Sequence, residues 1–391
     1  EEVDIFAGVD GGSTQTRVVI HDTRFPDSIT EDLERKYVIP SVSSSVPDNR
    51  EFPKDVNLYD NMETYIINLN PDPNAVFKSV RLIRGTKYIN SELKENRLGS
   101  SLQKTLDETF YYNIVDGLGY AAMIKYGEAI PETINVWLGV SLPPDDKNAV
   151  NETRFRNQMK AFQWKHESGI TIRFNIKHVT IRTEPEAFIK AYYSLSDQEI
   201  PEYVLHLEGG GRSIGTEILI NGKSLHTSRK TLEFGGTQLL DEINNLWVAK
   251  NGGSPLRRPV LEQAVRTGFV KSGNSTIDAT EIVVAAKKEI AEKIVTQVMQ
   301  SVFDQQSRVA IRDLNYITVS GRLFDDGDYG KSVADFLKEL FQRRTPDTEF
   351  VRITGNLIPA GLLIETYLET MENSQESQDQ SAQQEAAPAS E

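Results

Sequence analysis

Two segments of the chain, about half its length apart, repeat one pattern, and this repeat restricts the fold more than any other feature. Each segment reads as an apolar strand, a carboxylate, a glycine-rich turn with hydroxyl residues, and a second strand, at residues 5–20 and 204–220. Because β-prone residues flank both sides of each turn, each turn is predicted to be the tip of a β-hairpin. The repeat therefore predicts a duplicated, two-domain chain with one ligand between its halves.

The repeated turns have the composition of phosphate-binding loops. Glycines that adopt positive φ let successive backbone N–H groups approach an anion, and nearby hydroxyls add donors. Asp10 and Glu208 end the strands before the turns and would lie beside the phosphates. Carboxylates there call for a divalent cation, and Mg²⁺ binds through one or two carboxylates, water and phosphate oxygens. The alternative is two plain hairpins with glycine-rich turns, which the repetition disfavours.

The remaining sequence alternates strand-like and helix-like stretches, which is typical of an α/β protein. Capping boxes at Thr183–Glu186 and Asp278–Glu281 predict helix starts, and a further helix is expected from Leu357 to Tyr367. Polar, proline-containing stretches at Ser41–Lys54 and Asn251–Arg258 are expected to be loops. The helix after Asp278 carries an apolar i, i+4 ladder formed by Ile290, Ile294, Val298 and Val302.

Composition excludes several classes of function. The net charge of −14 argues against a large nucleic-acid surface, since such surfaces need clustered Lys and Arg. The sequence has no cysteine, which excludes disulfides, cysteine-based zinc sites and thiol nucleophiles. No stretch approaches the roughly 18 apolar residues of a membrane span, and the first residues lack signal-peptide features. We expect a cytoplasmic protein that binds neither membranes nor nucleic acid directly.

Other phosphate-binding motifs fail on spacing. Gly330-Lys331-Ser332 resembles the end of a P-loop, but Asp325 stands where the pattern needs glycine. The second turn lacks the third glycine of a dinucleotide-binding loop and leads into a strand instead of a helix. The five histidines show no metal-ligand spacing.

Five segments, in the same order along the chain, resemble the actin-like ATPase superfamily, which includes actin, MreB, FtsA, ParM and the heat-shock chaperone ATPases. They correspond to the first phosphate loop (8–14), the first connecting helix (183–187), the second phosphate loop (208–213), the adenosine segment (318–322) and the closing connecting helix (355–361). The Gly-Gly-Arg-Ser turn is most similar to ParM/StbA-type plasmid-segregation proteins. Two departures stand out: Glu208 where the family has aspartate, and Gly321-Arg322 where it has a glycine pair.

The resemblance implies an α/β, duplicated actin-like (ribonuclease H-like) fold with a nucleotide cleft between the halves. Domain I would span residues 1–183 and be completed by the C-terminal helix 356–371. Domain II would span residues 184–355. Residues 372–391, acidic and glutamine-rich, are expected to form a disordered tail because they have almost no apolar side chains.

The resemblance also implies site residues. ATP, or GTP in its place, would bind with Mg²⁺ organised by Asp10 and Glu208, while Glu184 orients the attacking water. The implied nucleotide-binding residues are Gly11, Gly12, Ser13, Thr14, Arg17, Gly209, Gly210, Gly211, Arg212, Ser213, Ser320, Gly321 and Arg322.

The function that this resemblance implies is that of a ParM-like actin homologue. Such a protein hydrolyses ATP and assembles head to tail with itself into nucleotide-dependent filaments for plasmid or DNA segregation, with a small DNA-binding adaptor protein as a second partner. Two alternatives stay open. One is a sugar or small-molecule kinase of the same fold, which needs a catalytic aspartate between the two turns; the other is a weakly hydrolysing nucleotide-sensing scaffold, which the Glu208 departure allows.

Overall fold

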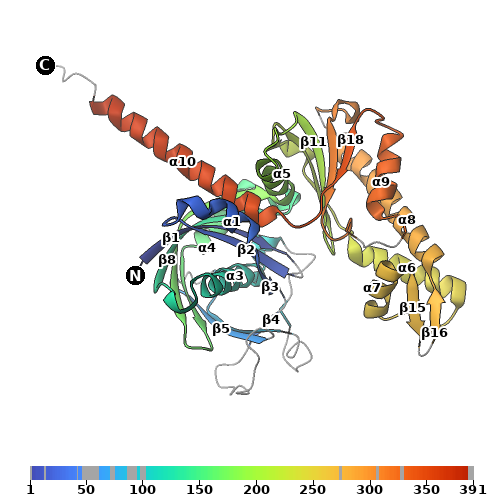
Figure 1. The fold of residues 1–391 in the computed structure, drawn as a ribbon, viewed down its shortest axis with the longest axis horizontal. Helices are drawn as coiled ribbons and strands as arrows, with labels where there is room; N and C mark the ends of the chain where they lie inside the picture. The colour runs from blue at the N-terminus through green and yellow to red at the C-terminus, as the bar shows by residue number, and fades with distance from the viewer. Residues whose placement is uncertain are drawn as a thin grey trace.

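The computed structural model describes residues 2–12, 15–41, 43–45, 61–70, 75–85, 95–96, 103–272, 275–304, 308–325 and 330–385. Two β-sheets, one in each half of the chain, lie side by side and carry helices on their faces (Figure 1). The long C-terminal helix α10 (Ile358–Glu385) begins between the halves and runs outward past the first sheet.

The first sheet has the strand order β3-β2-β1-β8-β10-β9-β5-β6-β4-β7. In this sheet β1 pairs antiparallel with β2 and parallel with β8, and β8 pairs parallel with β10. Its strands are β1 (Glu2–Gly11), β2 (Gln15–Asp22), β3 (Tyr37–Pro40), β4 (Ser43–Ser45), β5 (Asn61–Asn68), β6 (Val80–Gly85), β7 (Glu95–Asn96), β8 (Thr133–Leu142), β9 (Ala161–His166) and β10 (Thr171–Thr183). The helices of this half are α1 (Ile29–Glu34), α3 (Glu108–Tyr126) and α4 (Ala149–Gln158), with short 3₁₀ turns η1 (Pro26–Ser28), η2 (Lys104–Leu106), η3 (Gly127–Ala129) and η4 (Pro144–Asp146).

The second sheet has the order β13-β12-β11-β17-β18, with β14 added beside β12. It repeats the first arrangement, because β11 pairs antiparallel with β12 and parallel with β17. Its strands are β11 (Tyr203–Gly209), β12 (Ile214–Ile220), β13 (Lys223–Ser224), β14 (Lys230–Leu232), β17 (Tyr316–Ser320) and β18 (Glu349–Arg352); β15 (Phe269–Ser272) and β16 (Ser275–Asp278) form a separate hairpin. The helices are α5 (Glu184–Leu195), α6 (Gly236–Asn251), α7 (Arg258–Thr267), α8 (Thr280–Val298) and α9 (Val333–Gln342), with the 3₁₀ turns η5 (His226–Ser228) and η7 (Ile311–Asp313) and the short π-helix η6 (Met299–Phe303).

Because successive side chains of a strand point to opposite faces, the apolar side chains of each sheet contribute to two cores, one on each face. On β1, Val9 belongs to the core with α3, whereas Phe6 packs against α10. On β11, Leu205 and Leu207 belong to the core with α6, α8 and α9, whereas Val204 packs against α5. Each half is therefore a sheet between a helical layer and one connecting helix, and each glycine-rich turn lies at the end of its central strand.

Most of the helices and loops expected from the sequence are confirmed. Thr183 caps α5 by accepting a hydrogen bond from the Glu186 amide (3.2 Å), and α6 ends at Asn251 before α7 begins at Arg258. The apolar ladder of α8 and its continuation is buried throughout, at 0–1% exposure.

Three expectations differ from the structure. Asp278 lies in β16 and bonds to the Thr280 amide (2.8 Å), so Ala279 and not Asp278 is the cap residue of α8. Ser43–Ser45 forms β4 within the expected loop because it pairs with β6 and β7, and residues 46–60 lie outside the described ranges. Helix α10 continues to Glu385, where a disordered tail was expected; Glu, Gln and Ala are good helix formers, and no glycine or proline interrupts them before Pro388.

A buried carboxylate lies below the cap of α5, where the two halves join. Thr183 donates a hydrogen bond to Glu217 of β12, Ser224 donates another (3.1 Å), and the Arg229 Nε lies 3.7 Å away. Burial raises the pKa of the Glu217 carboxyl to about 7 and Glu186 adds to this rise, while the hydrogen bonds and Arg229 oppose it. The folded protein therefore retains a proton on Glu217 at a pH where an unfolded chain would have lost it.

This proton makes stability depend on pH. The unfolded chain binds fewer protons than the folded one between about pH 4.5 and 7, so the contribution of Glu217 to stability falls as the pH rises through that window. Glu217→Gln, which stays neutral, is expected to lack this loss of stability. Its free energy of unfolding minus that of the wild type should be up to about 3 kcal/mol larger at pH 8 than at pH 5. Urea denaturation at both pH values measures this, with the exposed Glu199→Gln as the control. An unchanged pH slope in Glu217→Gln would contradict the assignment.

Candidate functional site

The first repeated turn is a hairpin, as its sequence predicts. Gly11 of β1 is paired with Thr16 of β2, and Asp10, the residue before it, is 4% exposed. The side-chain amide of Asn356, just before α10, donates to Asp10 Oδ2 (3.1 Å), and Arg17 Nη1 lies 3.6 Å from the same oxygen. Side chains from β2 and from the segment leading into α10 thus hold the Asp10 carboxylate at the end of β1.

The second turn is held by the segments that follow it in sequence. The Gly210 amide bonds to the Ser213 carbonyl (2.9 Å), which closes the turn between β11 and β12. The Gly211 carbonyl accepts from the Thr237 amide (2.8 Å) at the start of α6, and the Gly209 carbonyl accepts from the Leu323 amide (3.1 Å). The turn is therefore fixed from both sides, with Ser213 half-buried and Arg212 exposed.

Most of the turn glycines allow a close approach of neighbouring atoms and do not serve unusual backbone angles, whereas a Cβ on Gly211 would meet nothing within 4 Å. None of Gly11, Gly12, Gly209, Gly210 and Gly211 has positive φ, so the reason given from sequence for these glycines is wrong. A Cβ on the first of them would lie 2.8 Å from the Phe110 ring, and one on Gly209 would lie 2.6 Å from the Phe324 ring. Aromatic side chains therefore leave no room for larger residues at Gly11 and Gly209.

Glu184, at the first position of α5, is paired with a cation that the sequence did not single out. Lys104 Nζ lies 2.7 Å from Glu184 Oε1, and the two side chains are only 15% and 17% exposed. The Lys104 amide also bonds to Asp146 Oδ2 (3.1 Å), and its Nζ lies 5.6 Å from the centre of the Phe110 ring. Lys104 comes from η2 in the first half, so this ion pair joins the first half to α5.

Carboxylates of both hairpins act electrostatically on this ion pair. Burial raises the pKa of the Glu184 carboxyl, Lys104 opposes the rise, and the negative charges of Asp10 and Glu208 add to it. Burial alone would lower the pKa of Lys104, but the attraction of Glu184, Asp10 and Asp146 outweighs burial and raises it. Glu184 therefore lies within electrostatic range of the carboxylates that end β1 and β11, and Lys104 remains positively charged among them.

The donor set suits Mg²⁺. Asp10 and Glu208 offer hard carboxylate oxygens from two strands, and Ser141 Oγ lies 3.5 Å from Asp10 Oδ1. Within the described ranges, no three His, Asp or Glu side chains cluster as metal ligands, so the protein would supply one or two carboxylates and leave the other positions open. Mg²⁺ commonly binds in this way, with water and phosphate oxygens completing its octahedron.

The expected adenosine segment lies against the second turn. Ser320 is buried and donates a hydrogen bond to Glu208, so its hydroxyl already has a partner within the protein, while Arg322 is exposed. Gly321 has φ +97°, and a Cβ there would lie 2.5 Å from the Gly209 carbonyl oxygen. This glycine lets the segment fold back on the turn. Ser13 and Thr14, expected to bind phosphate, lie outside the described residues.

Sequence reasoning missed two residues next to the expected site. Lys104 carries no motif, and only tertiary structure brings it to Glu184. His206 is fully buried and lies two residues before Glu208, so its side chain is on the same face of β11. That spacing of two residues could have been noticed in the sequence.

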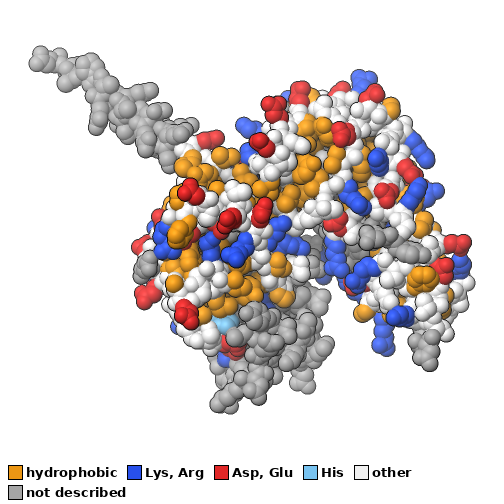
Figure 2. Space-filling model, in the orientation of Figure 1, with side chains coloured by type: hydrophobic (Ala, Val, Ile, Leu, Met, Phe, Trp, Pro, Cys, Tyr) orange, Lys and Arg blue, Asp and Glu red, His pale blue; other side chains and the backbone are white. Residues whose placement is uncertain are grey.

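In the space-filling view, Lys and Arg side chains gather where the two halves face each other (Figure 2).

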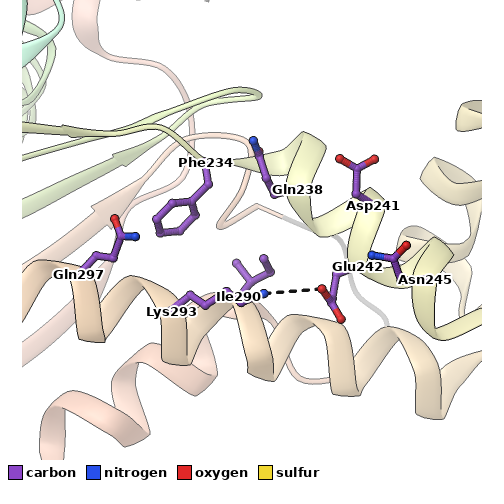
Figure 3. A pocket seen from close by; sticks show the side chains of 8 residues that line it. All are labelled: Phe234, Gln238, Asp241, Glu242, Asn245, Ile290, Lys293 and Gln297. Carbon is purple, nitrogen blue, oxygen red and sulfur yellow. Dashed lines mark ion pairs between the residues drawn. The ribbon is translucent and has the colours of Figure 1, made fainter.

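One cavity lies away from this site. It measures about 250 Å³ and lies between α6 and α8, with Phe234 and Ile290 on its apolar side (Figure 3). Lys293 and Glu242 face each other across it, 3.6 Å apart. We assign the site to the paired turns and not to this cavity, because the carboxylates that end both hairpins act on the Glu184–Lys104 ion pair.

Solved structures share this architecture over nearly the whole chain. An archaeal actin homologue superposes with a TM-score of 0.66 at 12% identity, over 93% of this chain and 99% of its own. The chain has the actin-like fold. Bacillus thuringiensis ParM with ATP superposes with a TM-score of 0.59 at 14% identity, over 94% of this chain and 99% of its own. A ParM filament structure from Clostridium botulinum gives 0.58 at 15%, over 93% and 99%.

The likeness lies in the fold more than in the sequence. No protein-family model and no curated protein sequence matches the chain. The actin-like fold nevertheless accounts for the two similar sheets, for the hairpin at the end of each central strand and for the positions of α5 and α10. In the part of the chain that the structure describes, no helix has both the length and the apolar character needed to cross a membrane.

Proposed function

We propose that this chain is an actin-like ATPase that binds ATP with Mg²⁺ between its two hairpin turns, hydrolyses it and assembles head to tail into filaments that separate plasmid or other DNA copies. The observation that carries the proposal is that the largely buried Glu184–Lys104 ion pair lies within electrostatic range of the carboxylates that end β1 and β11. Asp10 and Glu208 belong to the two hairpins, and both of their charges act on Glu184, which is paired with Lys104.

The roles of the residues follow from charge and position. The turn amides and Arg17 would hold phosphate oxygens, and Lys104 would offset the charge of the terminal phosphate. Once Lys104 turns toward that phosphate, the Glu184 carboxylate is free to accept a hydrogen bond from the attacking water. Mg²⁺, when bound beside Asp10 and Glu208, would neutralise phosphate charge. Phosphoryl transfer to water needs positioning and charge neutralisation, and this set of residues supplies both.

Assembly is supported by relatives of the same fold. One of the similar structures is a ParM with ATP, and another is a whole ParM filament. A nucleotide that bridges the two halves would favour one arrangement of them. In that arrangement the protein would present the surface that binds the next subunit, and hydrolysis would weaken this contact between subunits. Head-to-tail contacts that do not close into a ring give open helical filaments. Because the chain has a net charge of −14, it would reach DNA through a separate basic adaptor.

Phosphate release and right-angle light scattering, followed together after ATP and Mg²⁺ are added, test the function. Scattering that rises and then decays with phosphate release supports a dynamic filament, and negative-stain images identify the polymer. Flat scattering with phosphate transfer to a sugar indicates a kinase, and binding without either signal indicates a scaffold. A parallel series with GTP defines the nucleotide. The absence of any nucleotide binding would refute the proposal.

Asp10→Ala is expected to abolish Mg²⁺-dependent nucleotide binding, because it removes the carboxylate that Asn356 and Arg17 hold at the first turn. Calorimetric titration with ATP in Mg²⁺ measures the loss, which we expect to exceed about 100-fold. Asp197→Ala, on the exposed turn after α5, is the control. Wild-type affinity in Asp10→Ala would remove the first turn from the site.

A further inference from the structure

Four polar side chains share one buried face of the second sheet. In the parallel pairing of β11 with β17, His206 lies opposite Thr318, and Glu208 lies opposite Ser320. Since residues two apart on a strand point to the same face, the four form one patch on the side of α5. Their exposures are 0% for His206 and Thr318, 1% for Ser320 and 9% for Glu208.

These side chains form a connected chain of hydrogen bonds that ends on Glu208. The Thr318 hydroxyl donates to His206 Nδ1 (2.8 Å), because Nε2 must carry the ring proton in order to donate to Ser320, whose own proton goes to Glu208. On the other side of the ring, His206 Nε2 lies 3.0 Å from Ser320 Oγ and 3.5 Å from Glu208 Oε2. Ser320 donates to the same Glu208 oxygen. One carboxylate oxygen is thus held, through two hydroxyls and an imidazole, by side chains of β11 and β17.

Packing fixes two members of this chain, His206 and Glu208. The imidazole of His206 stacks on the Phe188 ring of α5, with centroids 4.9 Å apart and an interplanar angle of 17°. A Cβ on Gly321 would lie 2.6 Å from Glu208 Oε1, so the bare glycine makes room for the second carboxylate oxygen. The glutamate side chain is therefore confined between a held oxygen and a position that only glycine fits.

A structural role alone accounts poorly for this patch. The opposite face of the same strands is filled by Leu205, Leu207, Ile317 and Val319. Burying an imidazole and a carboxylate costs free energy that apolar side chains would not. The polar patch lies at the end of β11, where the candidate site begins, which is where such a cost is expected to serve function.

We propose that His206, Thr318 and Ser320 are positioning residues for the Glu208 carboxylate, and that they let a glutamate serve at the second turn where an aspartate would be one methylene shorter. The proposal rests on the proposed function, in which Glu208 faces the Mg²⁺ of the bound nucleotide. An aspartate at 208 would draw its carboxylate back from Ser320 and His206. The three side chains should therefore affect Mg²⁺-dependent ATP binding when residue 208 is glutamate and not when it is aspartate.

A double-mutant cycle tests this by binding, without reference to hydrolysis. The readout is the ratio of ATP affinities in Mg²⁺ and in EDTA, measured by calorimetry. Ser320→Ala is expected to lower this ratio by about tenfold, as is typical when a residue that orients a metal ligand is lost. In a Glu208→Asp background, the same replacement should change the ratio less than about twofold. His206→Phe, which retains an aromatic ring against Phe188, should repeat both results.

Ser228→Ala is the matched control, since it also removes a buried hydroxyl that bonds to the second sheet, through the Ile218 amide (2.8 Å). Its Mg²⁺ ratio should match the wild type even if its thermal midpoint falls. Equal effects of Ser320→Ala in the glutamate and aspartate backgrounds would overturn the proposal, as would equal losses with and without Mg²⁺. A wild type that binds no nucleotide overturns the proposed function itself, whereas wild-type binding that Ser320→Ala leaves unchanged overturns the positioning role alone.

Discussion

Glu184→Gln is expected to slow phosphate release by at least about 100-fold while leaving nucleotide affinity within about threefold of the wild type. The neutral amide can still accept a hydrogen bond from Lys104, so the local structure should persist, but it is a far weaker acceptor for the attacking water. Filaments should form and then decay more slowly, since their decay depends on hydrolysis. Single-turnover phosphate release and light scattering measure the two effects.

Two comparisons define what this result means. Glu186→Gln changes the other carboxylate in the first turn of α5, which lies 3.9 Å from Lys147 and from Arg182, and should alter phosphate release less than about threefold. Lys104→Met should weaken ATP binding instead, because it removes the largely buried positive charge that is paired with Glu184. Hydrolysis at the wild-type rate in Glu184→Gln would remove this residue from the mechanism.

Gly361→Ala is expected to lower the free energy of unfolding by at least about 3 kcal/mol, although alanine normally stabilises a helix relative to glycine. A Cβ at this position of α10 would lie 1.7 Å from the Ala187 carbonyl oxygen of α5. Both atoms belong to rigid helices, so the clash can be relieved only by separating α10 from α5. Urea denaturation measures the loss, and failure to accumulate as a folded protein is its extreme form.

The matched control is Gly236→Ala, which adds a methyl group at the first position of α6, where the nearest atom would lie 3.7 Å away. It should change stability by less than about 1 kcal/mol. If Gly361→Ala unfolds at the same urea concentration as the wild type, the close crossing of α10 and α5 is wrong. Gly8 is the corresponding position under α10 on β1, where a Cβ would lie 1.9 Å from the Pro359 carbonyl oxygen.

The outline of the fold was predictable because it depends on local patterns. The repeated strand, carboxylate and glycine turn predicted both hairpins, and β1–β2 and β11–β12 are those hairpins. The Thr183 cap predicted the start of α5, since an N-cap needs only its own side chain and the amides that follow. The actin-like architecture was predicted from the order of these local motifs, and the similar solved structures agree with it.

The candidate site was predicted less completely. Asp10, Glu208 and Glu184 were expected there, and the charges of Asp10 and Glu208 contribute to the raised pKa of the Glu184 carboxyl. Lys104 was not expected, because it carries no motif and lies 80 residues before its partner. Positive φ was the wrong reason for the turn glycines, and at Gly11 and Gly209 the rings of Phe110 and Phe324, which are distant in sequence, exclude larger side chains.

Periodicity, turn residues and capping signals act over a few residues, so the amino-acid order alone was enough to specify two hairpins, their carboxylates and the connecting helices. Which oxygen of Glu208 is held, which cation faces Glu184 and which glycines admit a neighbouring helix depend on groups that meet only after the chain has folded. These contacts join β11 to β17, η2 to α5, and α5 to α10. Their energies depend on distances of a few ångströms across the folded core, and no local pattern encodes those distances.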